Sequence, residues 1–238
     1  MMESVFVLIA ALAPVCLLLL YIYRKDKFQQ EPVKELMKAF AAGGLSVFLS
    51  LLISIPTVGV GVDEIYSIPD ALKMAFLGAA IPEELAKFLM LWFVVRRNRY
   101  FDEHMDGIVY AVYVSLGFAA IENIMYLFDN YDSWVSVGIS RALFAIPGHF
   151  AFGVLMGYYY SLVRFSPVPS LKNKILVLAA PMLVHGLYDS ILLAIDVTPV
   201  ASIILMILFL FLCHRMWKYG NKKIVEHLER DRMTFNEE

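Results

Sequence analysis

Long apolar runs separated by short polar connections organise this chain. About 20 apolar residues, at 1.5 Å of helical rise each, cross the hydrocarbon of a bilayer. The pattern predicts seven such helices, at 4–23, 36–55, 70–95, 106–128, 138–163, 173–195 and 199–217. Turn-forming residues end the second and fifth runs, namely Pro56, Gly59, Gly61 and Pro69, then Pro167 and Pro169. We therefore expect an all-α polytopic membrane protein, a bundle of about seven transmembrane helices.

Composition supports the same class. The chain has 238 residues, 60% of them apolar, and a mean hydropathy of +0.68, which excludes an ordinary soluble domain. Its formal net charge of −2 gives no basis for binding nucleic acid. Both cysteines, Cys16 and Cys213, lie in apolar runs and are interpreted as small buried hydrophobes. The first run has no basic segment before it, so we interpret it as an uncleaved span.

Lysine and arginine alternate between the connections. The first, third and fifth connections and the C-terminal segment are basic, whereas the second, fourth and sixth contain no lysine or arginine. Since cytoplasmic loops carry the excess of these residues, the N-terminus is expected outside and the C-terminus in the cytoplasm. We divide the chain into a transmembrane domain at 1–218 and a charged cytoplasmic tail at 219–238. The expected location is a bacterial cytoplasmic membrane, crossed several times.

Ionisable residues lie inside four of the predicted spans. They are Glu83, Glu84 and Lys87, then Glu122, then His149, and finally His185 and Asp189. Measured from the predicted outer ends of their spans, these residues lie roughly 9 to 17 Å below the surface. Such residues are costly in lipid and usually pair with one another around a polar cavity. A layer of carboxylates and imidazoles at one depth favours hydrolytic chemistry.

Local spacing suggests pairings within this layer. Lys87 lies three and four residues after the two glutamates, so its ammonium reaches either carboxylate on a helix. Asp189 lies four residues after His185 and is suited to fix its tautomer. Structural ion pairs between helices are the alternative interpretation, and Glu122 with Asn123 would then be a polar helix contact. Phe118 lies one turn before Glu122 on the same helix.

Other polar residues have simpler interpretations. The acidic residues at 102, 103 and 106 fall in a first helical turn, where they complement the helix dipole. Arg141 is expected to snorkel to the surface or to pair with an acid. The chain contains neither His-Glu-x-x-His nor Gly-x-Ser-x-Gly, so the usual zinc-protease helix and serine-hydrolase elbow are absent from the sequence.

Taken in order, these segments resemble the PrsW family of bacterial intramembrane proteases. The matching segments are Glu83-Glu84-x-x-Lys87, Phe101-Asp102-Glu103-x-x-Asp106-Gly107-Ile108-Val109-Tyr110, Gly117-Phe118-Ala119-x-x-Glu122-Asn123, His149 and His185-Gly186-x-x-Asp189. The family is grouped with CAAX-processing membrane proteases and with a scaffold subunit of gamma-secretase. The resemblance implies site-1 cleavage of a membrane-spanning anti-sigma factor on its extracytoplasmic side, which starts a stress response.

The resemblance also implies which residues form the active centre. They are Glu83, Glu84, Glu122, His149 and His185. We expect one of the two adjacent glutamates to activate water, and His149, His185 or Asn123 to donate to the oxyanion.

Two alternatives stay open at this point. No cofactor is favoured, but zinc held by His149, His185 and Glu122 or Glu84 would serve the same reaction. A non-enzymatic scaffold or a proton-coupled transporter would also bury such residues.

Overall fold

The computed structural model describes residues 2–58 and 65–236 and is helical in all its regular elements there. Gly59 and Gly61 of the predicted turn lie outside the described residues. The long helices are α1 (Met2–Lys25), α2 (Val33–Val58), α4 (Ile81–Val95), α5 (His104–Asp129), α7 (Ile146–Arg164), α8 (Leu171–Val197) and α9 (Ser202–Phe235). Shorter helices are α3 (Ile68–Lys73) and α6 (Trp134–Ser140), the π-helices η1 (Met74–Ala80) and η3 (Arg141–Ala145), and the 3-10 turns η2 (Tyr131–Ser133) and η4 (Pro199–Ala201). The all-α membrane class is therefore confirmed.

Within residues 2–58 and 65–236, six helical segments are long and apolar enough to cross a membrane. They are Glu3–Lys25, Val33–Pro56, His104–Asp129, Tyr131–Arg164, Leu171–Val197 and Pro199–Phe235. The remaining predicted span corresponds to the continuous helical segment α3–η1–α4. This segment is long enough to cross a membrane, but it carries more charged residues than the other six have in their apolar stretches. Its charges include Glu83, Glu84 and Lys87, the residues that drew attention in the sequence.

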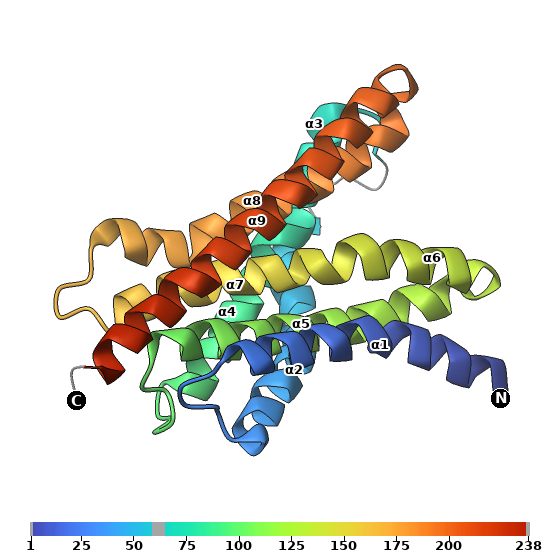
Figure 1. Ribbon diagram of the computed structural model, residues 1–238. Coiled ribbons are helices and arrows are strands. Elements are labelled where there is room, and N and C mark those ends of the chain that lie inside the picture. The colour runs from blue at the N-terminus through green and yellow to red at the C-terminus, as the bar shows by residue number, and fades with distance from the viewer. Residues whose placement is uncertain (1, 59–64, 237–238) are drawn as a thin grey trace.

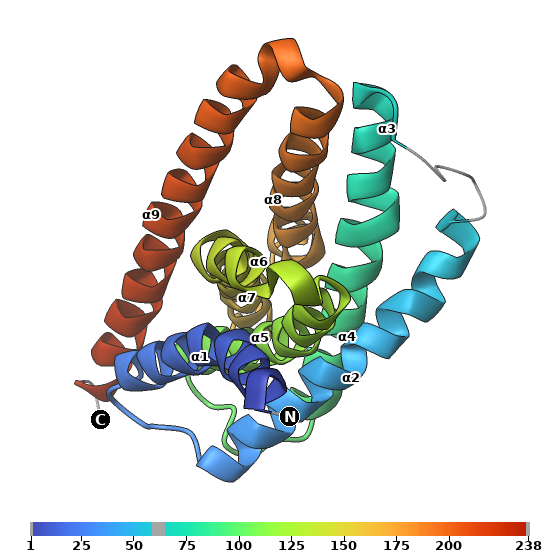
Figure 2. The same ribbon diagram turned by 90° about the vertical axis from the view of Figure 1, so that its right-hand side faces the viewer.

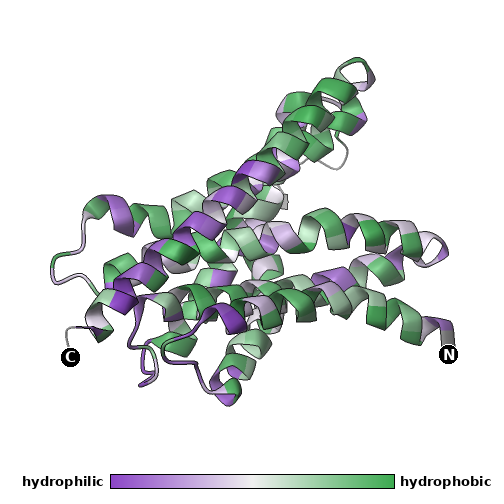
Figure 3. Ribbon diagram, viewed as in Figure 1, coloured by the Kyte–Doolittle hydropathy of each residue, from purple (hydrophilic) through white to green (hydrophobic). Residues whose placement is uncertain are grey.

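Helix α5 forms the centre of the bundle. In Figure 2, α5 and α7 lie in the middle, with α1, α2, α4, α8 and α9 around them. The apolar window of α5 is 78% buried, whereas that of α9 is only 11% buried, which fits a central and a peripheral helix. Figure 3 shows hydrophobic residues along most of the helices and hydrophilic ones on the connections and the C-terminal part of α9.

Glycines allow α5 to approach its neighbours closely. A Cβ atom on Gly117 of α5 would lie 2.0 Å from the carbonyl oxygen of Phe40 on α2. A Cβ on Gly157 of α7 would lie 2.1 Å from the carbonyl oxygen of Gly107 on α5. Helices in membranes pack through small residues of this kind, because lipid provides no hydrophobic force between them. These contacts fix α5 against both neighbours.

Two π-helical turns precede the residues of interest. η1 runs directly into α4, where Pro82 lies in the first turn, and η3 runs directly into α7, where Pro147 lies in the first turn. Proline cannot donate a backbone hydrogen bond, and single π turns often mark functional sites in helices. Glu83 and His149 follow within two residues of these prolines, so both side chains come from locally irregular helix.

The C-terminal segment continues α9. The helix passes residue 218 without a break and ends at Phe235, and Ile224, His227 and Asp231 are buried. The carboxylate of Asp231 accepts hydrogen bonds from the backbone N–H groups of His104 (2.9 Å) and Met105 (2.8 Å) at the start of α5. The charged segment predicted at 219–238 is thus helical as far as Phe235 and is docked on the start of α5 through Asp231.

Buried carboxyl groups gather where this end of α9 meets α5 and the α1–α2 connection. Asp106 accepts from the backbone N–H groups of Asp102 (2.8 Å) and Glu103 (2.7 Å), as expected for an acid in a first helical turn. Asp26 and Glu103 are buried in the same region. Burial, with nearby carboxylates adding to it, raises the pKa of Asp26 to about 6 and that of Glu103 to about 8.

Stability should therefore fall as pH rises. The Glu103 carboxyl stays protonated in the folded chain up to about pH 8 but ionises from about pH 4.5 once unfolded, so folding weakens across that window. Glu103→Gln should flatten the dependence of the thermal unfolding midpoint on pH in detergent, and raise the midpoint at pH 8. The exposed Glu229→Gln is the matched control. Parallel curves for Glu103→Gln and the unchanged protein would contradict this assignment.

Candidate active site

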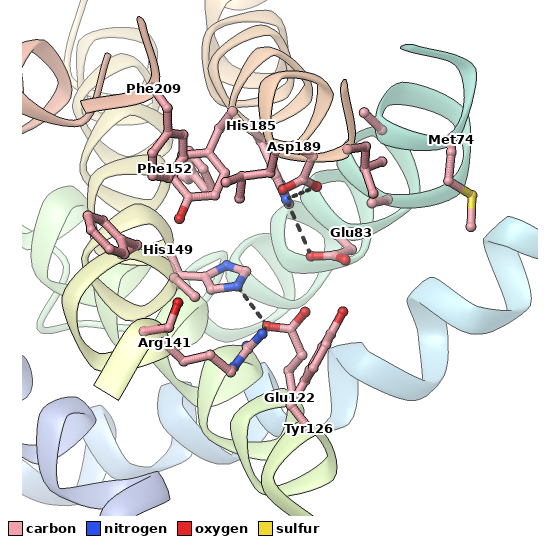
Figure 4. A pocket seen from close by; sticks show the side chains of 18 of the residues that line it. Met74, Glu83, Glu122, Tyr126, Arg141, His149, Phe152, His185, Asp189 and Phe209 are labelled. Atoms are coloured by element: carbon pink, nitrogen blue, oxygen red, sulfur yellow. Dashed lines mark hydrogen bonds and ion pairs between the residues drawn. The ribbon is translucent and has the colours of Figure 1, made fainter. Parts of the chain in front are cut away.

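Side chains from five helical segments meet at one cavity of about 460 Å³ (Figure 4). Glu83 comes from α4, Glu122 from α5, Arg141 from η3, His149 from α7, and His185 and Asp189 from α8. All six line the cavity. The structure thus brings together ionisable residues that the sequence placed at one depth in separate spans.

The two adjacent glutamates have different surroundings. Glu83 lines the cavity and its side chain is 15% exposed, whereas the Glu84 side chain is completely buried behind it. Adjacent residues point about 100° apart around a helix axis, which is why the pair divides in this way. Glu83 is the glutamate that a molecule in the cavity would meet.

The Lys87 ammonium lies at the centre of the buried cluster. Its Nζ atom is 3.2 Å from the Glu83 carboxylate, 2.8 Å from the Glu84 carboxylate and 3.2 Å from Nδ1 of His149. It also lies 4.1 Å from the ring centroid of Phe118, a cation–π contact. One buried cation therefore holds α4, α5 and α7 together.

The contacts of His149 define its tautomer. Nδ1 faces the Lys87 ammonium, which only donates, so Nδ1 is the acceptor and the proton lies on Nε2. Nε2 is 2.9 Å from the Glu122 carboxylate and donates to it. Ser115 donates to the His149 backbone carbonyl at 2.7 Å, which fixes this turn of α7 against α5. His149 is thus a neutral imidazole that connects Lys87 to Glu122.

Glu122 is held from its other side by Arg141. The guanidinium donates to the Glu122 carboxylate at 2.6 Å through an Nη atom, and to the Asn123 side-chain oxygen at 2.6 Å through Nε. The Asn123 amide nitrogen donates to the Ala11 carbonyl of α1 at 2.7 Å. Of the two fates expected for Arg141, pairing with an acid is the one observed. Asn123 positions Arg141, and its amide nitrogen is already used for α1.

His185 lies between two carboxylates. Its Nδ1 is 2.9 Å from Glu84, and its Nε2 is 3.2 Å from Asp189. Both ring nitrogens donate at once only in the doubly protonated imidazolium, so the contacts fit a charged ring. The Phe152 ring stacks on it with centroids 4.5 Å apart. Asp189 contacts His185, as the four-residue spacing predicted, but on a doubly protonated ring it holds the orientation and does not select a tautomer.

Three groups in this cluster have the spacing of metal ligands. Among the described residues, Glu83, Glu84 and His149 each offer an atom, and these atoms lie within 4.8 Å of one another. This set differs from the one expected from the sequence, which was His149 and His185 with Glu122 or Glu84. The Lys87 ammonium contacts all three groups, so it takes the place that a metal would need. The donor types fit a metal, and in this arrangement the Lys87 ammonium lies among them.

Apolar side chains form the rest of the cavity wall. They come from η1, η3, α7, α8 and α9, and include Met74, Phe144, Leu192, Met206 and Phe209. The small residues Ala75, Gly78 and Ala79 lie on the η1 side. The sequence singled out none of these residues, nor Ser115 or Phe152, because in an apolar run they look like any other packing residue.

The fold and the site define a polytopic membrane protein with a buried Glu/His centre suited to hydrolysis. The PrsW family of intramembrane metalloproteases matches residues 31–214, and the chain belongs to this family. The protein is accordingly an intramembrane protease of a bacterial membrane. The scaffold and transporter alternatives are set aside.

Relatives with a curated name support the assignment over most of the chain. Protease PrsW of Clostridioides difficile (strain 630) is 31% identical over 94% of this chain and 92% of its own length. The protein of the same name from Geobacillus kaustophilus is 38% identical over 78% and 79%, and that from Bacillus subtilis (strain 168) is 37% identical over 79% and 83%. No solved structure matches the chain.

Arg141 should matter for cleavage because it fixes Glu122. We expect Arg141→Gln to lower kcat/KM for a membrane substrate by up to roughly 100-fold, the cost of a misplacement of about 1 Å in an active site. Arg141→Lys keeps the charge but not both hydrogen bonds, so its kcat/KM should lie between those of Arg141→Gln and the unchanged protein.

Arg164→Gln, at the far end of α7, is the matched control and should leave cleavage unchanged. Measuring kcat/KM across pH separates a specific effect from misfolding, because loss of Arg141 should also move the profile. Arg141→Gln with the activity and pH profile of the unchanged protein would contradict the role.

Proposed function

We propose that the protein cleaves peptide bonds within the membrane by means of a water activated by Glu83. The observation that carries this proposal is the division of the glutamate pair. Glu83 lines the cavity, and Glu84 lies behind it in contact with Lys87 and His185. A general base must reach a water beside the scissile bond, and Glu83 is the glutamate of the pair placed to do so.

The other residues prepare this base. Lys87 holds Glu83 at 3.2 Å and keeps the carboxylate oriented toward the cavity. Glu84 neutralises Lys87 and fixes His185, so it acts through other residues. The imidazolium of His185 lies 4.0 Å from Glu83 and also lines the cavity. We assign Glu83 to proton abstraction, and Lys87 and Glu84 to its positioning.

Positive groups on the cavity wall suit the oxyanion that forms during attack. Arg141 lines the cavity beside Glu122, and its bonds to Glu122 and Asn123 use two of its five N–H donors. His185 also lines the cavity, and it contributes its positive charge rather than a free N–H, because both of its ring nitrogens already face carboxylates. A donor aimed at the developing charge contributes about 2.7–4 kcal/mol in measured proteases. After attack, the proton taken by Glu83 would pass to the leaving amine, which breaks the peptide bond and returns the carboxylate.

Replacing each of the two glutamates with glutamine tests this mechanism. Glu83→Gln should lower kcat by about 10²–10⁴, the usual contribution of a general base, and should lower the unfolding midpoint less than Glu84→Gln does, because Glu83 is the more distant and more exposed partner of Lys87. Glu84→Gln should lower the midpoint as well, because it leaves the buried Lys87 and His185 short of a carboxylate. Wild-type cleavage by Glu83→Gln would exclude Glu83 as the base.

A metal-dependent mechanism is the second candidate. It is supported by the family description and by the three ligand atoms within 4.8 Å of one another. Glu83, Glu84 and His149 would hold the ion, and zinc in such a site supplies an activated water and polarises the carbonyl. The Lys87 side chain would have to leave its position among them. Arg141 and His185 would keep the same roles toward the substrate.

Lys87→Met separates the two mechanisms. If Lys87 positions Glu83, the variant should lose most cleavage and contain no bound metal. If a metal belongs at this centre, the variant should retain zinc by elemental analysis, and a chelator should inhibit the unchanged protein reversibly. About one zinc per purified chain, with cleavage abolished by chelator and restored by zinc, would overturn the glutamate mechanism.

We infer that the substrate is a single-span anti-sigma factor cut on its extracytoplasmic side. The inference follows from the family resemblance and from the estimated depth of the site, nearer the outer surface. Reconstituted cleavage of candidate anti-sigma factors, with the product termini read by mass spectrometry, tests it. Cuts confined to the cytoplasmic half of the substrate span would contradict the inference.

A further inference from the structure

A second depression lies away from the active site, between α2 and the end of α4. It is a groove of about 810 Å³, within the range of roughly 300–1,000 Å³ typical of small-ligand sites. Figures 1 and 2 place the start of α2 near the end of α4. The lining residues come from 32–45 and 93–100, so they share none with the catalytic cavity.

The polar end of the groove is strongly basic. Four cations line it, Lys34 and Lys38 from α2 and Arg97 and Arg99 from the connection that follows α4, against the single acid Glu35. Glu35 pairs with Lys38 at 2.7 Å, and Arg99 bonds the Tyr100 hydroxyl at 2.6 Å. In the part of the chain described here, the side chains of Lys34 and Arg97 have neither a hydrogen bond nor an ion pair. Two unpaired cations, one from α2 and one from the connection after α4, therefore line the same groove.

The other end of the groove is apolar. Leu45 of α2 and Phe93 of α4 are each 60% exposed and line it, together with Ala41, Ala42 and Val94. The small side chains of Ala41 and Ala42 leave the groove open along the helix surface. The groove thus combines a positively charged end with an apolar end. A free inorganic anion would contact only the charged end.

The position in the chain agrees with this chemistry. The basic residues belong to the two connections, 26–32 with the start of α2 and 96–103, that the distribution of lysine and arginine assigns to the cytoplasmic side. The cytoplasmic leaflet is enriched in anionic lipids, and basic pockets between membrane helices on that side bind the head groups of these lipids. We propose that this groove binds one anionic phospholipid, its phosphate between Lys34 and Arg97 and an acyl chain along Ala41, Leu45 and Phe93.

Lipid binding measured on the full-length protein tests the proposal. Native mass spectrometry of detergent-solubilised protein titrated with phosphatidylglycerol should resolve one tighter-binding lipid, and phosphatidylcholine should not replace it. At about 1 kcal/mol per cation near a membrane surface, Lys34→Gln with Arg97→Gln should weaken that lipid roughly 30-fold. Both residues are exposed, so the variant should fold.

Two controls separate a site from general attraction. Lys172→Gln with Lys174→Gln removes the same charge from another basic segment and should leave the tight lipid unchanged. Ala41→Phe keeps every charge but fills the apolar end, and should weaken lipid binding at least fivefold. Glycerol phosphate should fail to compete, because it lacks the chain.

Three outcomes would overturn the proposal. The first is an unchanged tight lipid in the Lys34/Arg97 variant, and the second is an equal loss in the Lys172/Lys174 variant. The third is full competition by glycerol phosphate, which would make the groove a simple anion site. Cleavage by the Lys34/Arg97 variant is read separately, since neither residue belongs to the catalytic cavity.

Discussion

The structure of the site depends on one buried cation. Lys87 is 1% exposed and contacts two carboxylates and an imidazole that come from two helices, at 2.8 to 3.2 Å. An ammonium ion in such surroundings is stable only with its partners in place, and removing one partner from a buried pair typically costs about 3–5 kcal/mol. The packing of α4 against α5 and α7 and the orientation of Glu83 are therefore one constraint rather than two.

From that centre, hydrogen bonds extend through the rest of the bundle. His149 donates to Glu122, and Arg141 donates to both Glu122 and Asn123. The Asn123 amide in turn donates to a backbone carbonyl of α1. On the other side, Glu84 connects Lys87 to His185 on α8. Close glycine contacts and the two π turns let the backbones approach closely enough for these short bonds. The polar chain joins helices that lipid alone would leave weakly associated.

The sequence predicted a good part of this site. The apolar runs located the helices, and the ionisable residues within them were the ones that meet at the cavity, because a charge in hydrocarbon has few uses other than a polar cluster. The spacing of His185 and Asp189 predicted their contact. The sequence suggested His149, His185 and Glu122 or Glu84 as metal ligands, whereas Glu83, Glu84 and His149 have the spacing of ligands in the structure. The difference arises because distances between side chains on separate helices cannot be predicted from spacing along the chain.

Periodicity and helix geometry thus determined the class of protein and the approximate positions of its helices, because those follow from the bilayer and from 1.5 Å per residue. Tertiary structure alone decided that Glu83 rather than Glu84 faces the cavity, that Arg141 pairs with Glu122, and that Lys87 occupies the centre of the ligand set. The same holds for the docking of Asp231 on the start of α5. Each of these depends on how one helix is rotated against another, and close packing between helices fixes that rotation.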